Sequence, residues 1–202
     1  MREIILASAS KRRSEILASC GITHTILPSN VDEIDKDKGP VEEIVRQNAI
    51  LKAGKAAENS DDAVIISADT LVAHGDLVIG KPKDEEEAKD ILSRFSGETI
   101  KVCTGICVMD CASGNTVTDV DISEVRVTDM DEKEVEKYFA LLGPYDKAGG
   151  FSIEGIGSMI FDDIKGSYFN ILGLSMMKIK SLFEDTGLDI FDYIDKDKVE
   201  RI

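Results

Sequence analysis

Apolar and polar positions alternate along the chain in segments that predict strands and helices in turn. Continuous apolar runs at residues 4–7 and 63–68 are typical of buried strands. Longer runs at 102–109 and 116–127, joined by a turn at 112–115, predict two paired strands. The other predicted strands are short and lie at residues 23–28, 71–74, 77–79 and 158–161, the middle two forming a hairpin across Gly75 and Asp76.

Helices are predicted between these strands, where apolar residues recur at helical spacing. The first helix is expected to begin with Ser14 as its N-cap and to bury Ile16 and Leu17. Pro40 marks the start of the second helix, and Ser96-Gly97 marks the stop of the third. The predicted helices after the first lie at residues 41–57, 84–95, 131–142 and 169–183, the last preceded by a turn at 164–167.

The order of these elements predicts the fold class. Strands and helices alternate at first and paired strands follow, which favours an α/β fold with a mixed sheet flanked by helices. A chain of 202 residues without an internal repeat predicts one unit, with two lobes around a central cleft. We expect a single domain at residues 1–186 and a frayed acidic tail at residues 187–202.

Charge and hydropathy narrow the choice of partners. The chain carries 39 acidic and 24 basic residues, for a net charge of −15. Nucleic acid is not expected as a partner, because non-specific binding to it requires an excess of positive charge. No membrane span is predicted either, since the chain lacks an apolar run of about 18 residues.

The four cysteines predict thiols rather than a metal centre. Cys103, Cys107 and Cys111 recur at a spacing that places them on one face of a predicted strand, and no Cys-x-x-Cys pair occurs. Buried, reduced thiols are therefore expected in place of a thiolate metal site. Because the first residues also lack a signal-peptide pattern, we expect a cytoplasmic location.

Residues 6–17 combine the features of an anion-binding segment. A strand leads into the small polar loop Ser8-Ala9-Ser10, three cations follow at Lys11, Arg12 and Arg13, and a helix begins. Backbone N–H groups, a positive helix terminus and guanidinium groups would then converge on one place. The alternative is a solvated basic turn, which the local pattern alone does not exclude.

Carboxylates and two further lysines are candidates for chemistry on such an anion. Asp69 follows a buried strand, at a place where α/β sheets often bind ligands, and suits metal coordination or proton abstraction. Its alternative is a turn residue that bonds its own backbone. Asp32 and Glu33 lie in a loop after a strand, Lys81 lies on a stiff turn before a proline, and Lys52 lies on a helix face.

Covalent catalysis is not expected. His24 and His74 lie inside predicted strands, without a partner at a metal-binding spacing. No serine–histidine pair is suggested by the order of residues, so a nucleophilic mechanism has little support.

Several of these segments resemble the motifs of the Maf family of nucleoside triphosphate pyrophosphatases. The first match runs from Ser8 to Leu17. The further matches, in chain order, are Val31-Asp32-Glu33, Ala68-Asp69-Thr70, Gly80-Lys81-Pro82, Asp146-Lys147-Ala148-Gly149-Gly150-Phe151, Ile153-Glu154-Gly155, and Gly166-Ser167 through Gly173-Leu174-Ser175. The resemblance covers about residues 3–185, and its many motifs at family-like spacing make it specific.

The resemblance implies a Maf- or inosine triphosphatase-like fold and hydrolysis of a nucleoside triphosphate to the monophosphate and pyrophosphate. It also implies a divalent cation, magnesium or manganese, and allows a homodimer. By position, Asp69 would be the general base and, with Glu33, a metal ligand. The resemblance places Ser8, Arg13, Lys52 and Lys81 at the phosphates and Arg12, Thr70 and Glu154 at the base.

Two residues depart from the family pattern. Lys11 stands where the family usually has proline, and Glu154 stands where the thymidine and uridine triphosphate subgroup has glutamine. The 7-methyl-GTP subgroup does have glutamate there, together with a tryptophan near Arg12, but this chain has no tryptophan. An ionised glutamate only accepts hydrogen bonds. Glu154 therefore favours a base edge rich in N–H donors, or it is protonated or paired with Arg12.

The resemblance thus predicts a housecleaning pyrophosphatase for pyrimidine or modified nucleoside triphosphates. One alternative is a nucleotide-binding regulator of septation without catalysis. The others are pyrophosphatases for 7-methyl-GTP or for deaminated purine triphosphates.

Overall fold

The structure, a computed structural model, describes residues 2–142 and 148–199 and contains a seven-stranded mixed sheet among them. The strands are β1 (Glu3–Leu6), β2 (Thr25–Ile26), β3 (Ala63–His74), β4 (Leu77–Ile79), β5 (Thr99–Asp110), β6 (Asn115–Val127) and β7 (Phe161–Lys165). The α-helices are α1 (Lys11–Ser19), α2 (Val41–Ala57), α3 (Glu85–Phe95), α4 (Glu132–Leu142), α5 (Tyr168–Ile171) and α6 (Met176–Thr186). Short 3₁₀ helices are η1 (Ala148–Gly150), η2 (Gly155–Ile160) and η3 (Ile190–Tyr193).

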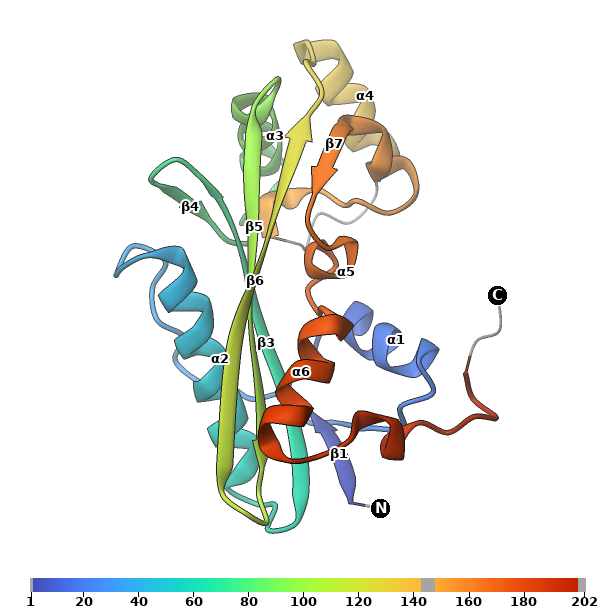
Figure 1. The fold of residues 1–202 in the computed structure, drawn as a ribbon. Coiled ribbons are helices and arrows are strands. Elements are labelled where there is room, and N and C mark those ends of the chain that lie inside the picture. Colours follow the sequence, from blue (N-terminus) through green and yellow to red (C-terminus); the bar gives the residue numbers. More distant parts are fainter. Residues whose placement is uncertain (1, 143–147, 200–202) are drawn as a thin grey trace.

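The sheet combines a parallel part and an antiparallel part, which confirms the predicted fold class. Its strand order is β2-β1-β3-β5-β6-β7, with β4 paired to β3 beside this path. Strands β2, β1 and β3 run parallel, whereas β3, β5, β6 and β7 are antiparallel neighbours. The long strands β3, β5 and β6 form the centre of the molecule (Figure 1).

Strand β3 is longer than the sequence pattern predicts. The prediction ended it at residue 68 and began a separate hairpin strand at residue 71, but β3 is continuous from Ala63 to His74. The reason is β5, which pairs with β3 from Val64 to Ala73 and carries the ladder past the polar residues. Asp69 therefore lies inside the strand rather than after it, three residues beyond Ile66, the last partner of β1.

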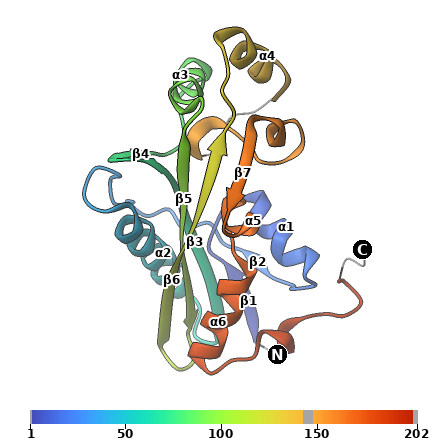
Figure 2. The same cartoon turned by 45° about the horizontal axis from the view of Figure 1, so that its top comes forward.

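Helices cover the two faces of the sheet. On one face, α2 packs its small apolar residues, among them Ala49 and Ala53, against Ile5, Ile65 and Cys107. The larger core lies on the other face and includes residues of α1, α3, α4 and α6. Helix α2 accordingly stands across the strands from α6 in both views of the molecule (Figures 1 and 2). Helices α3 and α4 gather at one end of the long strands, away from α1 and α6 (Figure 2).

Several predicted boundaries are wrong. Helix α1 begins at Lys11 with Ser10 as its N-cap, so the three cations form its first turn instead of preceding Ser14. Strand β2 is shortened to Thr25–Ile26. Most of the predicted strand at 158–161 lies in η2. The predicted turn at 164–167 overlaps the end of β7, because β7 continues to Lys165 through its pairing with β6. The predicted helix at 169–183 is interrupted between α5 and α6 at residues 172–175, around Gly173, which has a positive φ.

The C-terminal segment is folded rather than frayed through residue 199. Ile190 and Tyr193 of η3 are buried in the main core. Ile194 forms a bridge with Ile22, and the backbone N–H of Asp195 donates to the Gly21 carbonyl at 2.9 Å. A side chain at Gly21 would lie 2.6 Å from the Asp195 carbonyl oxygen, so the last segment sits directly on the end of α1.

The four cysteines are free, as predicted, but only Cys103 and Cys107 are buried, on one face of β5; Cys20 and Cys111 are half-buried, and Cys111 follows the strand. Burial raises the pKa of Cys103 to about 11 and that of Cys107 to about 12, so both thiols stay protonated. Among the described helices, none is long and apolar enough to cross a membrane.

Candidate active site

A cavity of about 840 Å³ gathers the nine residues that the family resemblance assigned to the site, whereas Asp32, also a candidate, is not on its lining. The loop between β1 and α1, the residues before α2, strand β3 and the segment at 148–154 contribute its walls. The predicted residues on its lining are Ser8, Arg12, Arg13, Glu33, Lys52, Asp69, Thr70, Lys81 and Glu154. The structure therefore brings together residues from five sequence-distant motifs. Two further motif residues, Asp146 and Lys147, lie outside the described residues.

Arg13 is a cation of the cavity wall that is bonded to several of the surrounding segments. Its Nε donates to the Gly173 carbonyl at 2.8 Å, and its Nη1 donates to Ser8 Oγ and to the Ala68 carbonyl, each at 2.9 Å. Its Nη2 donates to Thr70 Oγ1 at 2.9 Å. Burial lowers the pKa of Arg13, which the negative charges of Asp69 and Glu33 partly oppose, but an arginine remains charged at neutral pH. Four of its five N–H groups thus hold the cleft walls together, and one on Nη2 remains for a ligand.

Ser8 closes the loop that leads into α1. Its Oγ accepts from the Ser10 backbone N–H at 3.2 Å and from Arg13 at 2.9 Å. Because both of these bonds use oxygen lone pairs, the hydroxyl proton of Ser8 is left to donate into the cavity. The side chain is buried at 8% exposure, so its orientation is fixed by these partners.

Two carboxylates on the cavity lining meet at one lysine. Lys52 Nζ lies 2.6 Å from Asp69 Oδ1 and 2.8 Å from Glu33 Oε1. Asp69 and Lys52 are buried at 7% and 9% exposure, whereas half of the Glu33 side chain is exposed. Asp69 Oδ2 accepts a second hydrogen bond, from Asn48 Nδ2 at 3.0 Å. Each Asp69 oxygen keeps a second lone pair for a water molecule or a cation.

Asn48 is a site residue that the sequence reasoning missed. It is buried at 2% exposure on α2, one helical turn before Lys52. The signal was present in the sequence, because Asn48 occupies an apolar position of this helix, four residues after Ile44. A polar side chain on the buried face of a helix needs a partner, and Asp69 is that partner.

The residues expected to read the base fall into two groups. Arg12 Nη1 pairs with Glu154 Oε2 at 3.1 Å across the cavity, which is one of the arrangements predicted for Glu154. Thr70 instead bonds Arg13 and, at 2.9 Å, Thr104 Oγ1. Since Thr104 donates its own proton to the Asn170 carbonyl, the Thr70 hydroxyl donates to Thr104. Only one lone pair of Thr70 is then left to accept from a ligand.

Lys81 stands on the exposed rim, between Gly80 and Pro82. The Gly80 carbonyl accepts from the Gly149 N–H at 2.9 Å, which fastens this turn to η1. The ammonium group of Lys81 is thus carried on a fixed backbone at the mouth of the cavity.

A serine–histidine pair does exist, contrary to expectation. Ser14 Oγ and His24 Nε2 are 2.8 Å apart, and His24 Nδ1 lies 2.9 Å from the Ile22 carbonyl oxygen. A carbonyl accepts only, so in the neutral ring Nδ1 carries the proton and Nε2 accepts a hydrogen bond from the Ser14 hydroxyl. Ser14 is not on the cavity lining, and a backbone carbonyl takes the place of a carboxylate behind the histidine. The pair joins α1 to the following loop.

The side chains available at the site restrict which kind of metal ion it can bind. Over residues 2–142 and 148–199, no group of three or more His, Cys, Asp or Glu side chains could hold a metal ion. Glu33 and Asp69 do converge, since both contact Lys52 Nζ. Magnesium commonly takes one or two protein carboxylates and completes its shell with water and substrate phosphates. The two residues fit such a shared site.

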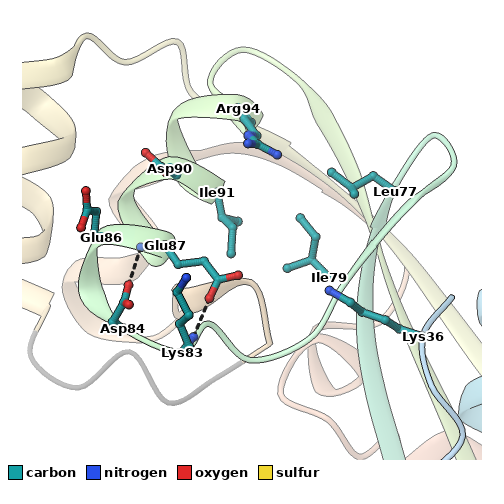
Figure 3. A pocket seen from close by; sticks show the side chains of 10 residues that line it. All are labelled: Lys36, Leu77, Ile79, Lys83, Asp84, Glu86, Glu87, Asp90, Ile91 and Arg94. Carbon is teal, nitrogen blue, oxygen red and sulfur yellow. Dashed lines mark hydrogen bonds between the residues drawn. The ribbon is translucent and has the colours of Figure 1, made fainter.

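A second cavity of about 460 Å³ lies between α3 and the β3–β4 hairpin (Figure 3). Two of its charged side chains bond the start of α3: Asp84 Oδ1 accepts from the Glu87 N–H at 2.8 Å, and Glu87 accepts from the Lys83 N–H at 2.7 Å. These bonds cap the helix, and the predicted site residues lie elsewhere.

The comparisons agree with the motifs. The family model described as Maf-like protein matches residues 3–186. A dTTP/UTP pyrophosphatase of Dictyoglomus thermophilum is 38% identical over 191 residues, which cover 94% of this chain and 98% of that protein. A dTTP/UTP pyrophosphatase of Alkaliphilus metalliredigens is 42% identical over 180 residues, or 89% and 93% of the two chains. A solved HAM1 protein from Coxiella burnetii, 14% identical, has a TM-score of 0.49 with coverage of 90% and 91%. Because the family model spans nearly the whole chain and relatives this similar align over almost their full length, the chain belongs to the Maf family.

Proposed function

We propose that the protein hydrolyses a nucleoside triphosphate to the monophosphate and pyrophosphate, with a pyrimidine nucleotide as its substrate, and so clears such nucleotides from the pool. The observation that carries this proposal is that the Asp69, Lys52 and Glu33 group and the Ser8–Arg13 pair line one cavity. The names of the relatives, dTTP/UTP pyrophosphatases, support the same reaction.

Asp69 is proposed as the general base. Its carboxylate is buried and held at both oxygens, so its orientation toward a water molecule is fixed before the substrate binds. Attack of water on phosphorus requires positioning and stabilisation of charge, without a covalent intermediate. The cavity supplies that combination through its carboxylates and cations.

The cations are proposed to bind the phosphates. Lys52 and the remaining N–H of Arg13 face the cavity from its walls, the Ser8 hydroxyl donates from the loop, and Lys81 stands at the rim. Fixed donors of this kind stabilise the charge that develops on transferring phosphoryl oxygens. They also explain how a chain of net charge −15 could admit a polyanion, since the cations are concentrated at one place.

A divalent cation, magnesium or manganese, is proposed to bind Glu33 and Asp69. It would neutralise phosphate charge and polarise the reacting group when bound. Lys52 already bridges the same two carboxylates and keeps them together.

Base selection is proposed for Arg12, Glu154 and Thr70. Arg12 only donates, whereas ionised Glu154 and the free lone pair of Thr70 only accept. The pairing edge of uracil and thymine offers an N–H between two carbonyl oxygens, which suits such a set.

A cytoplasmic location and a homodimer remain predictions; the four free thiols agree with a reducing compartment.

A nucleotide panel tests the proposal. The protein is incubated with magnesium and dTTP, UTP, 7-methyl-GTP, inosine triphosphate and the standard nucleotides, and pyrophosphate and monophosphate are quantified. We expect turnover of the pyrimidine nucleotides and its loss in Asp69→Asn. The matched control is Asp84→Asn, which changes the cap of α3 outside the cavity and should keep full activity.

The outcomes separate the alternatives. Full activity of Asp69→Asn would remove the carboxylate from the mechanism. Tight nucleotide binding without any turnover would identify a regulator, and a preference for 7-methyl-GTP or inosine triphosphate would replace the pyrimidine assignment.

A further inference from the structure

Helix α2 directs two polar side chains, Asn48 and Lys52, to the carboxylate of Asp69. Lys52 lines the cavity, but Asn48 does not and is only 2% exposed. Asn48 uses both ends of its amide: Nδ2 donates to Asp69 Oδ2 at 3.0 Å, and Oδ1 accepts from the Ile34 backbone N–H at 2.8 Å. Its side chain therefore joins strand β3 to the segment before α2.

Lys52 forms a second bridge between the same two places. Its ammonium contacts Asp69 Oδ1 at 2.6 Å and Glu33 Oε1 at 2.8 Å. Residues 27–35 have no helix or strand of their own, so their position near the site depends on such side-chain bonds. Asp69 is thus linked to adjacent residues 33 and 34 twice, by side chains one turn apart on α2.

The rest of the buried face of α2 is apolar. Val45, Ala49, Ala53 and Ala56 pack on the sheet around Asn48. Asparagine is a poorer helix former than alanine, and its burial requires that every polar atom be bonded. Stability alone would favour an apolar residue at this position, which points to a role in the site.

We propose that Asn48 is a positioning residue of the active site: its amide fixes the orientation of the Asp69 carboxylate while holding the Glu33 segment beside it. This inference rests on the proposed function. It requires a side chain that donates to Asp69 and accepts from Ile34 at the same time, which an amide does and a carboxylate or an apolar group does not.

Two variants separate the two bonds. Asn48→Asp retains an oxygen for the Ile34 N–H but loses the donor to Asp69, whereas Asn48→Ala loses both. The matched control is Gln47→Glu, the same change from amide to carboxylate at the neighbouring position, whose amide bonds Glu43 away from the cavity.

The readouts are kcat, KM for the nucleotide, and hydrogen exchange of the Ile34 amide. Both Asn48 variants should lower kcat by about 10- to 100-fold with little change in KM, as loss of a group that orients a reacting carboxylate does. Exchange at Ile34 should accelerate in Asn48→Ala and stay slow in Asn48→Asp. Gln47→Glu should match the unmodified protein in all three.

Wild-type kcat in both variants, or unchanged Ile34 exchange in Asn48→Ala, would overturn the inference. If Asn48→Ala does not fold, the nearly isosteric Asn48→Asp decides by its kcat. If the unmodified protein turns over no nucleotide, the proposed function fails, while Ile34 exchange still shows whether Asn48 holds the segment.

Discussion

Arg13 and Arg12 are neighbours in sequence, yet their environments differ. Arg13 donates four hydrogen bonds to protein groups, two of them backbone carbonyls, whereas Arg12 has one carboxylate partner, Glu154. The planar guanidinium of Arg13 joins the β1–α1 loop, β3 and the α5–α6 connection at once. At this scale a cation that is expected to bind phosphate also holds the cavity together.

We predict that Arg13→Lys lowers both activity and stability. A lysine ammonium cannot reproduce four divergent bonds, and a buried acceptor left unpaired costs about 1–3 kcal/mol. Urea denaturation should show a loss of that order in the free energy of unfolding. Arg12→Lys serves as the control and should change it by less than about 1 kcal/mol, because one half-exposed ion pair contributes little. Equal losses would contradict the structural role of Arg13.

Asp110 gives the protein a pH-dependent contribution to stability. Its carboxylate accepts hydrogen bonds from Arg2, Ser113 Oγ and the Ala112 N–H. The bond from Arg2 lowers the pKa of Asp110 most, burial opposes it, and the other two bonds lower the pKa further. The folded pKa therefore lies below the unfolded value of about 3.9, so the stabilisation is present above that pH and is lost as pH falls through the folded pKa.

We therefore predict that Asp110→Asn is less stable than the unmodified protein at pH 7 by about 1–3 kcal/mol, and that the difference shrinks on acidification below about pH 4. Urea denaturation of both proteins at neutral and acidic pH measures this difference in stability. Asp76→Asn in the exposed β3–β4 turn is the control. A difference that is independent of pH would argue against the Arg2 bond.

At the scale of elements, the approach of α2 to the sheet sets the geometry of the site. Gly105 of β5 is paired with Asp69 in the ladder. A Cβ on Gly105 would lie 2.2 Å from the Val45 carbonyl oxygen and 2.6 Å from the Arg46 nitrogen. The backbone of α2 thus rests directly on the strand beside Asp69, which brings Asn48 and Lys52 within reach.

We predict that Gly105→Ala displaces α2 and removes most of the turnover. Overpacking of this kind costs about 1–3 kcal/mol, and the displaced helix withdraws its bonds from Asp69. Gly54→Ala on the same helix meets nothing within 4 Å and should be more stable by roughly 1 kcal/mol with activity kept. Thermal unfolding and nucleotide turnover check both. An active Gly105→Ala would show that the close approach is not required.

The sequence predicted the existence and type of the long elements, because their hydrophobic patterns are strong. It failed where distant partners decide the outcome. Strand β3 continues past Asp69 because β5 pairs with it, and β7 forms because β6 lies beside it. For the site, the motif resemblance named nine residues that line one cavity, but bonds such as Arg13 to Gly173 or Asn48 to Asp69 depend on tertiary contacts that spacing does not reveal.

Over the whole molecule, the C-terminal segment completes the core. The family model ends at residue 186, yet Leu188 and Ile194 pack against the core in which Ile190 and Tyr193 are buried. Tyr193 also packs edge-on against Phe183 at 5.6 Å between ring centres. The predicted domain of residues 1–186 would lack these contacts.

We predict that a chain ending at Gly187 is less stable by about 3–6 kcal/mol. Burying a large apolar side chain contributes about 1.5–3 kcal/mol, and this chain lacks the two buried ones, Ile190 and Tyr193. Tyr193→Ser should reproduce part of this loss, whereas Phe191→Ser, at a position 63% exposed in the same turn, should be nearly neutral. Calorimetry measures the unfolding of the shortened chain and of the two variants. Unchanged stability of the shortened chain would show that residues 1–186 fold independently.

The bridge between Ile194 and Ile22 also sets an order of assembly during synthesis. The loop after α1, the helix that carries Arg12 and Arg13, is covered by residues that follow every strand and α-helix of the described chain. During synthesis the end of α1 consequently stays uncovered until this segment has left the ribosome. Support for this end of α1 is therefore completed only after the sheet and the helices have been synthesised.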